Sequence, residues 1–151
     1  MKKTKNIKLI FGRPKNGWLP TKFESDGFEL EFNASRIPEN PTAELAESLI
    51  LTLKGVESKC EWNLEPEKYV FEFKSIESEF LLSIYKIDGQ KNKKLILANS
   101  GGFDSIVIPM YRGLKKLNST DFEKADWSKI NEVTLDKLNA LVSQRKSQNA
   151  Y

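Results

Sequence analysis

Short runs in which apolar and polar residues alternate constrain the fold of this chain more than any other feature. Phe28, Leu30 and Phe32 alternate with glutamate and asparagine, which is the pattern of a strand with one buried and one solvated face. Similar runs cover residues 60–65 and 69–73. Strands of this kind must share an apolar core, so the pattern predicts an antiparallel sheet.

The remaining strands follow from the same pattern and from turn residues between them. Ser25-Asp26-Gly27 and Asp88-Gly89 are typical of hairpin turns. The expected strands comprise residues 7–11, a hairpin over 18–32, and runs at 60–65, 69–73, 80–87, 95–98 and 106–108. Residues 99–102 are expected to form a loop before the last of these strands.

Three helices are expected. Asn40-Pro41 predicts a helix start, with asparagine as the N-cap and proline at the first helical position. Leu45, Leu49 and Leu53 then recur at every fourth residue, and Gly55 ends the helix. The other two helices are predicted over residues 109–117 and 134–144.

These elements predict an α+β fold: a mostly antiparallel sheet with one central helix packed on a face and two C-terminal helices. A chain of 151 residues fits a single domain, and we expect its ends, residues 1–5 and 147–151, to be frayed.

Composition excludes several kinds of active site. The chain has no histidine, so it has no histidine-based catalytic triad or metal site. Cys60 is the single cysteine, which excludes disulfide frameworks and thiolate zinc sites, and its alternation with Trp62 predicts a core position. Ser100-Gly101-Gly102 matches no known phosphate-binding loop. We therefore expect no cofactor and no metal.

Carboxylates remain as possible catalytic acids or bases. Glu29 and Glu31, or Glu61 and Glu65, lie at outward positions of predicted strands, where a catalytic carboxylate pair can be built. Glu29, Glu31 and Glu61 together offer oxygen ligands for a hard cation. The solvated face of a half-buried sheet explains the same residues without any chemistry. A small enzyme that uses only carboxylates is thus one alternative.

No apolar run is long enough for a secretory signal or a membrane span. The sequence therefore predicts a cytoplasmic protein, in agreement with its lone cysteine.

Basic residues suggest a second alternative, a nucleic-acid-binding domain. Residues 1–23 carry seven basic and no acidic residues, and three further cations lie in the predicted helix over residues 109–117. The candidate contacts are six of the seven N-terminal basic residues, Lys2, Lys3, Lys5, Lys8, Arg13 and Lys15, and Arg112, Lys115 and Lys116 in the helix. Because glutamates lie close to the aromatic strand at residues 69–73, we do not expect nucleic acid to be the main partner.

Four short stretches resemble small bacterial immunity-type proteins, which occur beside secreted polymorphic toxins, including those of contact-dependent growth inhibition systems. They are residues 17–20 (GWLP), 33–41 (NASRIPENP), 62–66 (WNLEP) and 109–114 (PMYRGL). The resemblance implies a non-enzymatic protein that binds a cognate toxin and occludes its active site. It transfers no individual functional residue to this chain.

Acidic residues then suggest the surface that binds such a partner. Residues 24–79 carry fourteen acidic and five basic residues, although the whole chain has a net charge of +3. Five glutamates there are expected to share one sheet face: Glu29, Glu31, Glu61, Glu65 and Glu72. An acidic face complements the positive groove of a nuclease, so we expect a basic toxin domain as the partner, with Trp18 as an apolar anchor.

Overall fold

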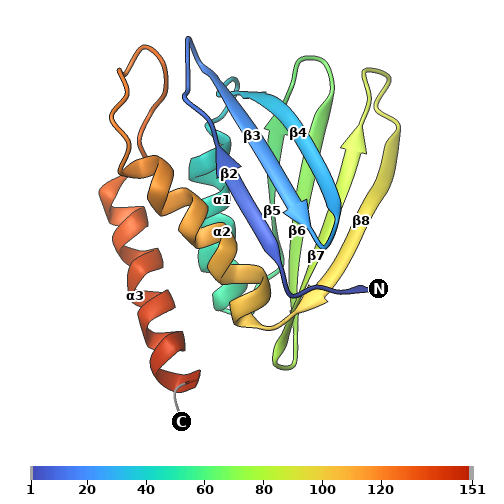
Figure 1. Cartoon of the computed structure of the whole chain (residues 1–151), viewed down its shortest axis with the longest axis vertical. Coiled ribbons are helices and arrows are strands. Elements are labelled where there is room, and N and C mark those ends of the chain that lie inside the picture. Colours follow the sequence, from blue (N-terminus) through green and yellow to red (C-terminus); the bar gives the residue numbers. More distant parts are fainter. Residues whose placement is uncertain (1, 150–151) are drawn as a thin grey trace.

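The computed structural model describes residues 2–149, which form one eight-stranded sheet and three helices (Figure 1). The strands are β1 (Lys2–Lys3), β2 (Ile7–Phe11), β3 (Trp18–Ser25), β4 (Phe28–Ser35), β5 (Ser58–Asn63), β6 (Lys68–Ile76), β7 (Glu79–Ile87) and β8 (Lys93–Gly101). The helices are α1 (Pro41–Leu53), α2 (Phe103–Asn118) and α3 (Glu132–Asn149). The predicted α+β class is confirmed.

The strand order in the sheet is β1-β8-β7-β6-β5-β4-β3-β2. Each pair of neighbours within residues 2–149 is antiparallel except β1 and β8, which are parallel. The hairpin between β3 and β4 turns at Asp26 and Gly27, whose φ angles are 45° and 92°. Positive φ at both central residues matches the twist of a tight hairpin, as the Asp-Gly pair predicts.

The sheet folds over itself, so its inner face, which carries the buried aromatic residues, encloses the core. Phe23 of β3 packs edge-on against Phe71 of β6, with ring centroids 5.5 Å apart. The ring centroids of Phe32 in β4 and Tyr69 in β6 are 5.1 Å apart. Because these inner faces meet, the outer faces of β3–β4 and of β5–β6 point away from each other.

Helix α1 fills the gap where β4 and β5 separate. In the described chain these two strands pair at Ser35 and Asn63 alone. Beyond that point the Glu61 N–H donates to Glu44 Oε1 (2.8 Å), and Ser48 Oγ donates to the Lys59 carbonyl (2.7 Å). Side chains of α1 thus satisfy backbone groups that a neighbouring strand would otherwise bind.

The predicted start and buried face of α1 are confirmed. The Asn40 side chain accepts a hydrogen bond from the Thr42 N–H (3.0 Å), Pro41 is the first helical residue, and Leu45 and Leu49 are fully buried. Helix α2 packs against β2, and α3 packs against α1, so the helices gather on one side of the sheet (Figure 1). None of the helices in residues 2–149 has the length and apolar character needed to cross a membrane.

Three predictions for residues 99–109 are wrong. Residues 99–101 are not a loop but the buried end of β8, and residues 106–108 lie inside α2 instead of forming a strand. Pro109 is likewise within α2 and not at its first position. Ile106 and Val107 are fully buried there, and burial of this kind outweighs the modest helix penalty of β-branched residues.

Regular secondary structure reaches close to both chain ends within the described residues. Lys2 and Lys3 pair with Asn99 and Ser100 of β8, and the Thr4 N–H donates to the Ser100 carbonyl (2.9 Å). Helix α3 extends to residue 149, beyond the predicted end at 144. The expectation for residues 1, 150 and 151 lies outside the described residues.

Candidate functional site

The outer face of β3 and β4 forms a continuous surface, called here the β3–β4 surface. It comprises Trp18, Pro20, Lys22 and Glu24 of β3 with Glu29, Glu31 and Asn33 of β4. These residues alternate with the buried Leu19, Phe23 and Phe32, and the antiparallel register sets Lys22 opposite Glu31 and Glu24 opposite Glu29. The predicted outward position of Glu29 and Glu31 is therefore confirmed.

Lys22 is surrounded by carboxylates on the β3–β4 surface. Its Nζ lies 3.1 Å from Glu24, 3.8 Å from Glu29 and 3.6 Å from Glu31. The hydrogen bond to Glu24 and the charges of Glu29, Glu24 and Glu31 raise the pKa of Lys22. Three carboxylates share one ammonium, so the group keeps an excess of negative charge.

The two glutamates of β4 are the exposed members of this group. The side chains of Glu29 and Glu31 are 61% and 71% exposed, against 32% for Lys22. The most exposed charges of this group are therefore negative. Lys8 of β2 lies opposite Glu24 in the register and is a further cation at the margin of the surface.

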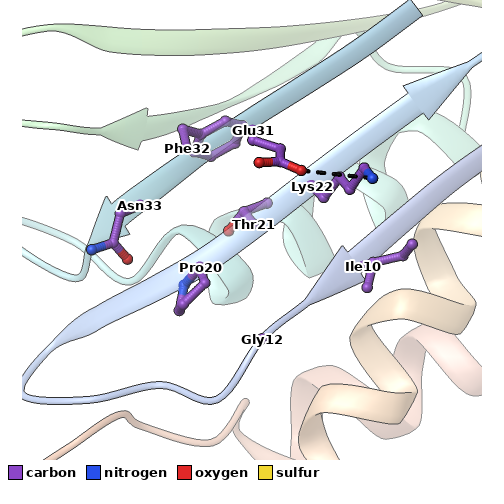
Figure 2. A pocket seen from close by; sticks show the side chains of 8 residues that line it. All are labelled: Ile10, Gly12, Pro20, Thr21, Lys22, Glu31, Phe32 and Asn33. Carbon is purple, nitrogen blue, oxygen red and sulfur yellow. Dashed lines mark ion pairs between the residues drawn. The ribbon is translucent and has the colours of Figure 1, made fainter.

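A shallow groove of about 430 Å³ crosses the β3–β4 surface (Figure 2). Ile10 and Gly12 border it on the β2 side, Pro20 and Lys22 of β3 lie along its middle, and Glu31 and Asn33 of β4 border the other side. Gly12 and Pro20 lie close together, because a Cβ on Gly12 would be 3.0 Å from the Pro20 Cβ. Ile10 is 46% exposed, so an apolar strip borders the carboxylates.

Trp18 lies at the start of β3, one outward position before Pro20, and is half-buried. The connection between α2 and α3 fixes this end of the strand: the Gly17 N–H donates to the Asp126 carbonyl (2.8 Å), and the Asn16 N–H to the Asp126 carboxylate (2.9 Å). The Arg36 guanidinium holds the same connection through the carbonyls of Lys124 and Ala125. The position of Trp18 is thus set by several long-range contacts.

Glu61 and Glu72 also project from the outer face, but from β5 and β6. Because the sheet folds over itself, they lie on the half that points away from Glu29 and Glu31. Glu61 pairs with Lys68 (3.2 Å), and Glu72 pairs with Lys93 (3.4 Å). The expected single acidic face is therefore divided in two, and the glutamates of its second half pair with lysines of β6 and β8.

Glu65 does not lie on a strand, contrary to the prediction that residues 60–65 are extended. β5 ends at Asn63, and Glu65 occupies the following turn with φ +51°. The Leu64 N–H donates to the Glu67 carbonyl (2.7 Å) and closes this turn. The ladder between β5 and β6 ends at the Asn63–Lys68 pair, so residues 64–67 form the connection between the two strands.

Glu44 is a titratable group that the sequence does not mark. It sits in the first turn of α1 beside Glu39 and Glu61, and burial, together with these carboxylates, raises the pKa of Glu44 to about 7, although the Glu61 N–H opposes this. Its hydrogen bond to β5 gives it a structural role. Cys60, next to Glu61, is fully buried, as predicted.

The basic residues of the nucleic-acid alternative come together in part. Arg13 and Lys116 line one groove of about 240 Å³ between β2 and α2. Lys3 instead pairs with Glu79 (2.6 Å), and Lys115 lies over the Tyr111 ring. No cluster of metal-ligating side chains occurs among residues 2–149.

Comparisons with known proteins give one weak structural likeness. No protein-family model and no curated protein sequence matches this chain. The fold aligns with a chain of the structure described as "CdiA-CT/CdiI toxin and immunity complex from Enterobacter cloacae", with a TM-score of 0.39 and 11% identity over 91% of this chain and 99% of that chain. A TM-score below 0.5 does not establish a common fold.

Proposed function

We propose that the protein is a non-enzymatic, immunity-type binding protein, and that its β3–β4 surface binds a cognate bacterial toxin domain. The observation that carries the proposal is the group around Lys22, where three carboxylates share one ammonium and the two most exposed residues are Glu29 and Glu31. The groove and Trp18 add apolar area next to these charges. Apolar area beside charge is the composition of a protein interface with a polar rim.

The charge of this surface favours a basic partner. Exposed carboxylates attract a positively charged domain and orient it during encounter, which raises the association rate more than the final affinity. Nucleases have positive grooves that hold phosphates, so a nuclease toxin fits this surface better than a pore-forming toxin. An inhibitor that covers such a groove blocks the substrate without any chemistry of its own.

The test is to purify this chain together with the C-terminal domain of the protein encoded immediately upstream of its gene. We expect a stable complex, and loss of that domain's cleavage of DNA or RNA once the complex forms. A domain that does not bind, or that stays fully active when bound, contradicts the proposal.

Trp18→Ala is expected to weaken the complex more than an alanine substitution of an exposed residue outside the β3–β4 surface does. Aromatic side chains that become buried in an interface contribute much of its binding energy.

Glu61, Glu65 and Glu72 belong to the proposal as a second contact region. They lie away from Glu29 and Glu31, so a partner touches both regions only if it extends around the edge of the sheet. Reversal of Glu61 and Glu72 to lysine, measured beside reversal of Glu29 and Glu31, separates the two regions. We expect the larger loss of binding from Glu29 and Glu31, because lysines already pair with the other two.

Nucleic-acid binding is the second candidate function. Its specific support is the groove between β2 and α2, which brings Arg13 and Lys116 together from distant parts of the sequence. Two cations beside each other attract phosphate but carry no base recognition.

A further inference from the structure

One edge of β8 is unpaired over six residues. The strand pairs with β7 along its length, but within residues 2–149 its other edge meets β1 at Asn99 and Ser100 alone. Residues 93–98 therefore form an open margin of the sheet, on the side away from the helices (Figure 1). This edge is separate from the β3–β4 surface.

The register shows which backbone groups point outward from β8. The Thr4 N–H donates to the Ser100 carbonyl, so Ser100 directs its backbone groups away from β7. In an antiparallel ladder, the residue at every second pair points its N–H and carbonyl away from the partner strand. Counted from the pair Leu81–Ser100, these pairs are Ser83–Ala98, Tyr85–Leu95 and Ile87–Lys93, with a bulge at Ile96 between the first and the second of them. Lys93, Leu95 and Ala98 thus present an N–H and a carbonyl to the open edge.

Side chains at this edge add apolar area between basic ends. Leu95, the third residue of β8, is 50% exposed and is followed by Ile96 and Leu97. Lys93 and Lys94 are exposed at one end, and Lys2 and Lys3 of β1 are exposed at the other. Lys93 pairs with Glu72 (3.4 Å) and Lys3 pairs with Glu79 (2.6 Å), so each end keeps an excess of one positive charge, from Lys94 and from Lys2. The edge is therefore apolar in its middle and positively charged at both ends.

The positive charges at both ends of this edge favour a different protein over a second copy of this chain as its partner. If two copies paired antiparallel through residues 93–98, Lys93 and Lys94 of each copy would approach Lys2 and Lys3 of the other. Like charges at both ends oppose that arrangement, and edge lysines are a common means of preventing it. An extended segment with acidic ends meets attraction at the same positions.

We propose that the open edge of β8 binds an extended segment of another protein as an added strand, and that this segment is apolar in its middle and acidic at both ends. Backbone hydrogen bonds to Lys93, Leu95 and Ala98 supply the affinity, and the flanking lysines select the sequence. An apolar residue opposite Leu95 covers its exposed side chain. The pairing of β1 with the same edge shows that it accepts a parallel strand.

The probe is a fluorescent eight-residue peptide with two acidic residues at each end and alternating threonine and valine between them. The same peptide with lysine ends is the matched comparison, and both are titrated with the full chain at low salt. We expect the acidic peptide to bind at least about tenfold more tightly, because charge complementarity discriminates between partners. Equal binding of the two peptides, or no binding of either, overturns the proposal.

Two variants locate the binding. Leu95→Pro removes an outward N–H and leaves the ladder with β7 intact, whereas Leu95→Ala keeps that N–H and trims the side chain alone. We expect the proline variant to bind the acidic peptide about fivefold more weakly than the alanine variant, the effect of one lost backbone hydrogen bond. Equal affinities contradict the proposed strand addition.

A charge variant keeps the test decisive if the proline variant fails to fold. Lys2→Glu combined with Lys94→Glu leaves the backbone unchanged and is expected to reverse the preference between the two peptides. An unchanged preference overturns the proposal. If the unmodified chain forms a dimer and Lys94→Glu strengthens that dimer, the edge of β8 binds a second copy of this chain. That result also overturns the proposal.

Discussion

Lys22 shows how a single residue determines the character of a surface. Its ammonium lies within 4 Å of three carboxylates, and it is less exposed than Glu29 and Glu31. Surface ion pairs of this kind add little to stability. Their arrangement matters instead for the charge that the surface presents, because its two most exposed ionised side chains are negative and Lys22, which pairs with them, is less exposed.

The raised pKa of Glu44 leads to a prediction about how the stability of the chain depends on pH. Its pKa is raised to about 7, so between about pH 4.5 and 7 the folded chain binds more protons than the unfolded chain. Stability is therefore expected to fall as the pH rises through this range. Glu44→Gln keeps the acceptor for the Glu61 N–H and removes the charge, so it should stabilise the chain at pH 8 by about 1 kcal/mol, after discounting for the half-exposed position.

Urea unfolding of the parent chain and Glu44→Gln at pH 5 and pH 8 measures this effect. Glu47→Gln is the matched control, because Glu47 is exposed on the same helix. If Glu44→Gln raises the free energy of unfolding equally at pH 5 and pH 8, the assigned role of Glu44 is wrong. The same conclusion follows if Glu47→Gln raises the free energy of unfolding as much as Glu44→Gln does.

The site residues show how far the sequence predicts a surface. Alternation correctly places Glu29 and Glu31 outward, because a period of two is a property of the strand itself. It does not predict that Lys68 and Lys93 pair with Glu61 and Glu72, since those contacts depend on register between strands. Blocks of charge along a sequence therefore need not become patches on a folded protein.

At the scale of elements, the contact between α2 and β2 depends on a glycine. A Cβ on Gly113 would lie 2.7 Å from the Leu9 carbonyl oxygen, and that oxygen belongs to the backbone of β2. In an exposed helix, glycine to alanine stabilises by up to about 1 kcal/mol. Here Gly113→Ala is expected to destabilise by about 1–3 kcal/mol, because the helix must move away from the strand.

Thermal or urea unfolding measures this change, with Arg112→Ala as the control at the neighbouring exposed position of α2. The control should stay within about 0.5 kcal/mol of the parent chain. If Gly113→Ala is as stable as the parent chain, the close approach of α2 and β2 is wrong.

Helix α2 also marks the limit of prediction for elements. Its residues 106–108 are β-branched and precede a proline, which locally favours a strand followed by a helix start. Packing against β2 and the sheet interior overrides that preference, and no local signal reveals it. In α1, by contrast, the N-cap, the first-turn proline and the leucine spacing agree, so its start is predicted correctly.

At the scale of the whole molecule, the fold separates surfaces of different charge. The β3–β4 surface has an excess of carboxylates, whereas the groove between β2 and α2 contains Arg13 and Lys116. The net charge of +3 describes neither surface. Association with a charged partner depends on these local fields and not on the net charge.

The nucleic-acid alternative gives a prediction at this scale. If the β2–α2 groove held phosphates, binding to DNA or RNA would weaken steeply as salt increases, with a slope set by the number of phosphate contacts. Our account predicts little binding even at low salt, and little change with Arg13→Ala and Lys116→Ala. Titration of single- and double-stranded probes at two low salt concentrations measures this. Strong binding that both substitutions weaken supports the alternative.

The most direct test of the central claim is the association rate of this chain with the toxin domain encoded beside it. Glu29→Lys combined with Glu31→Lys is compared with Glu47→Lys combined with Glu123→Lys, which gives the same change in net charge at exposed positions outside the β3–β4 surface. At low salt the first pair should slow association by about tenfold or more, and salt should largely remove the difference by screening. An unchanged association rate at low salt, or an equal effect of the control pair, contradicts the account.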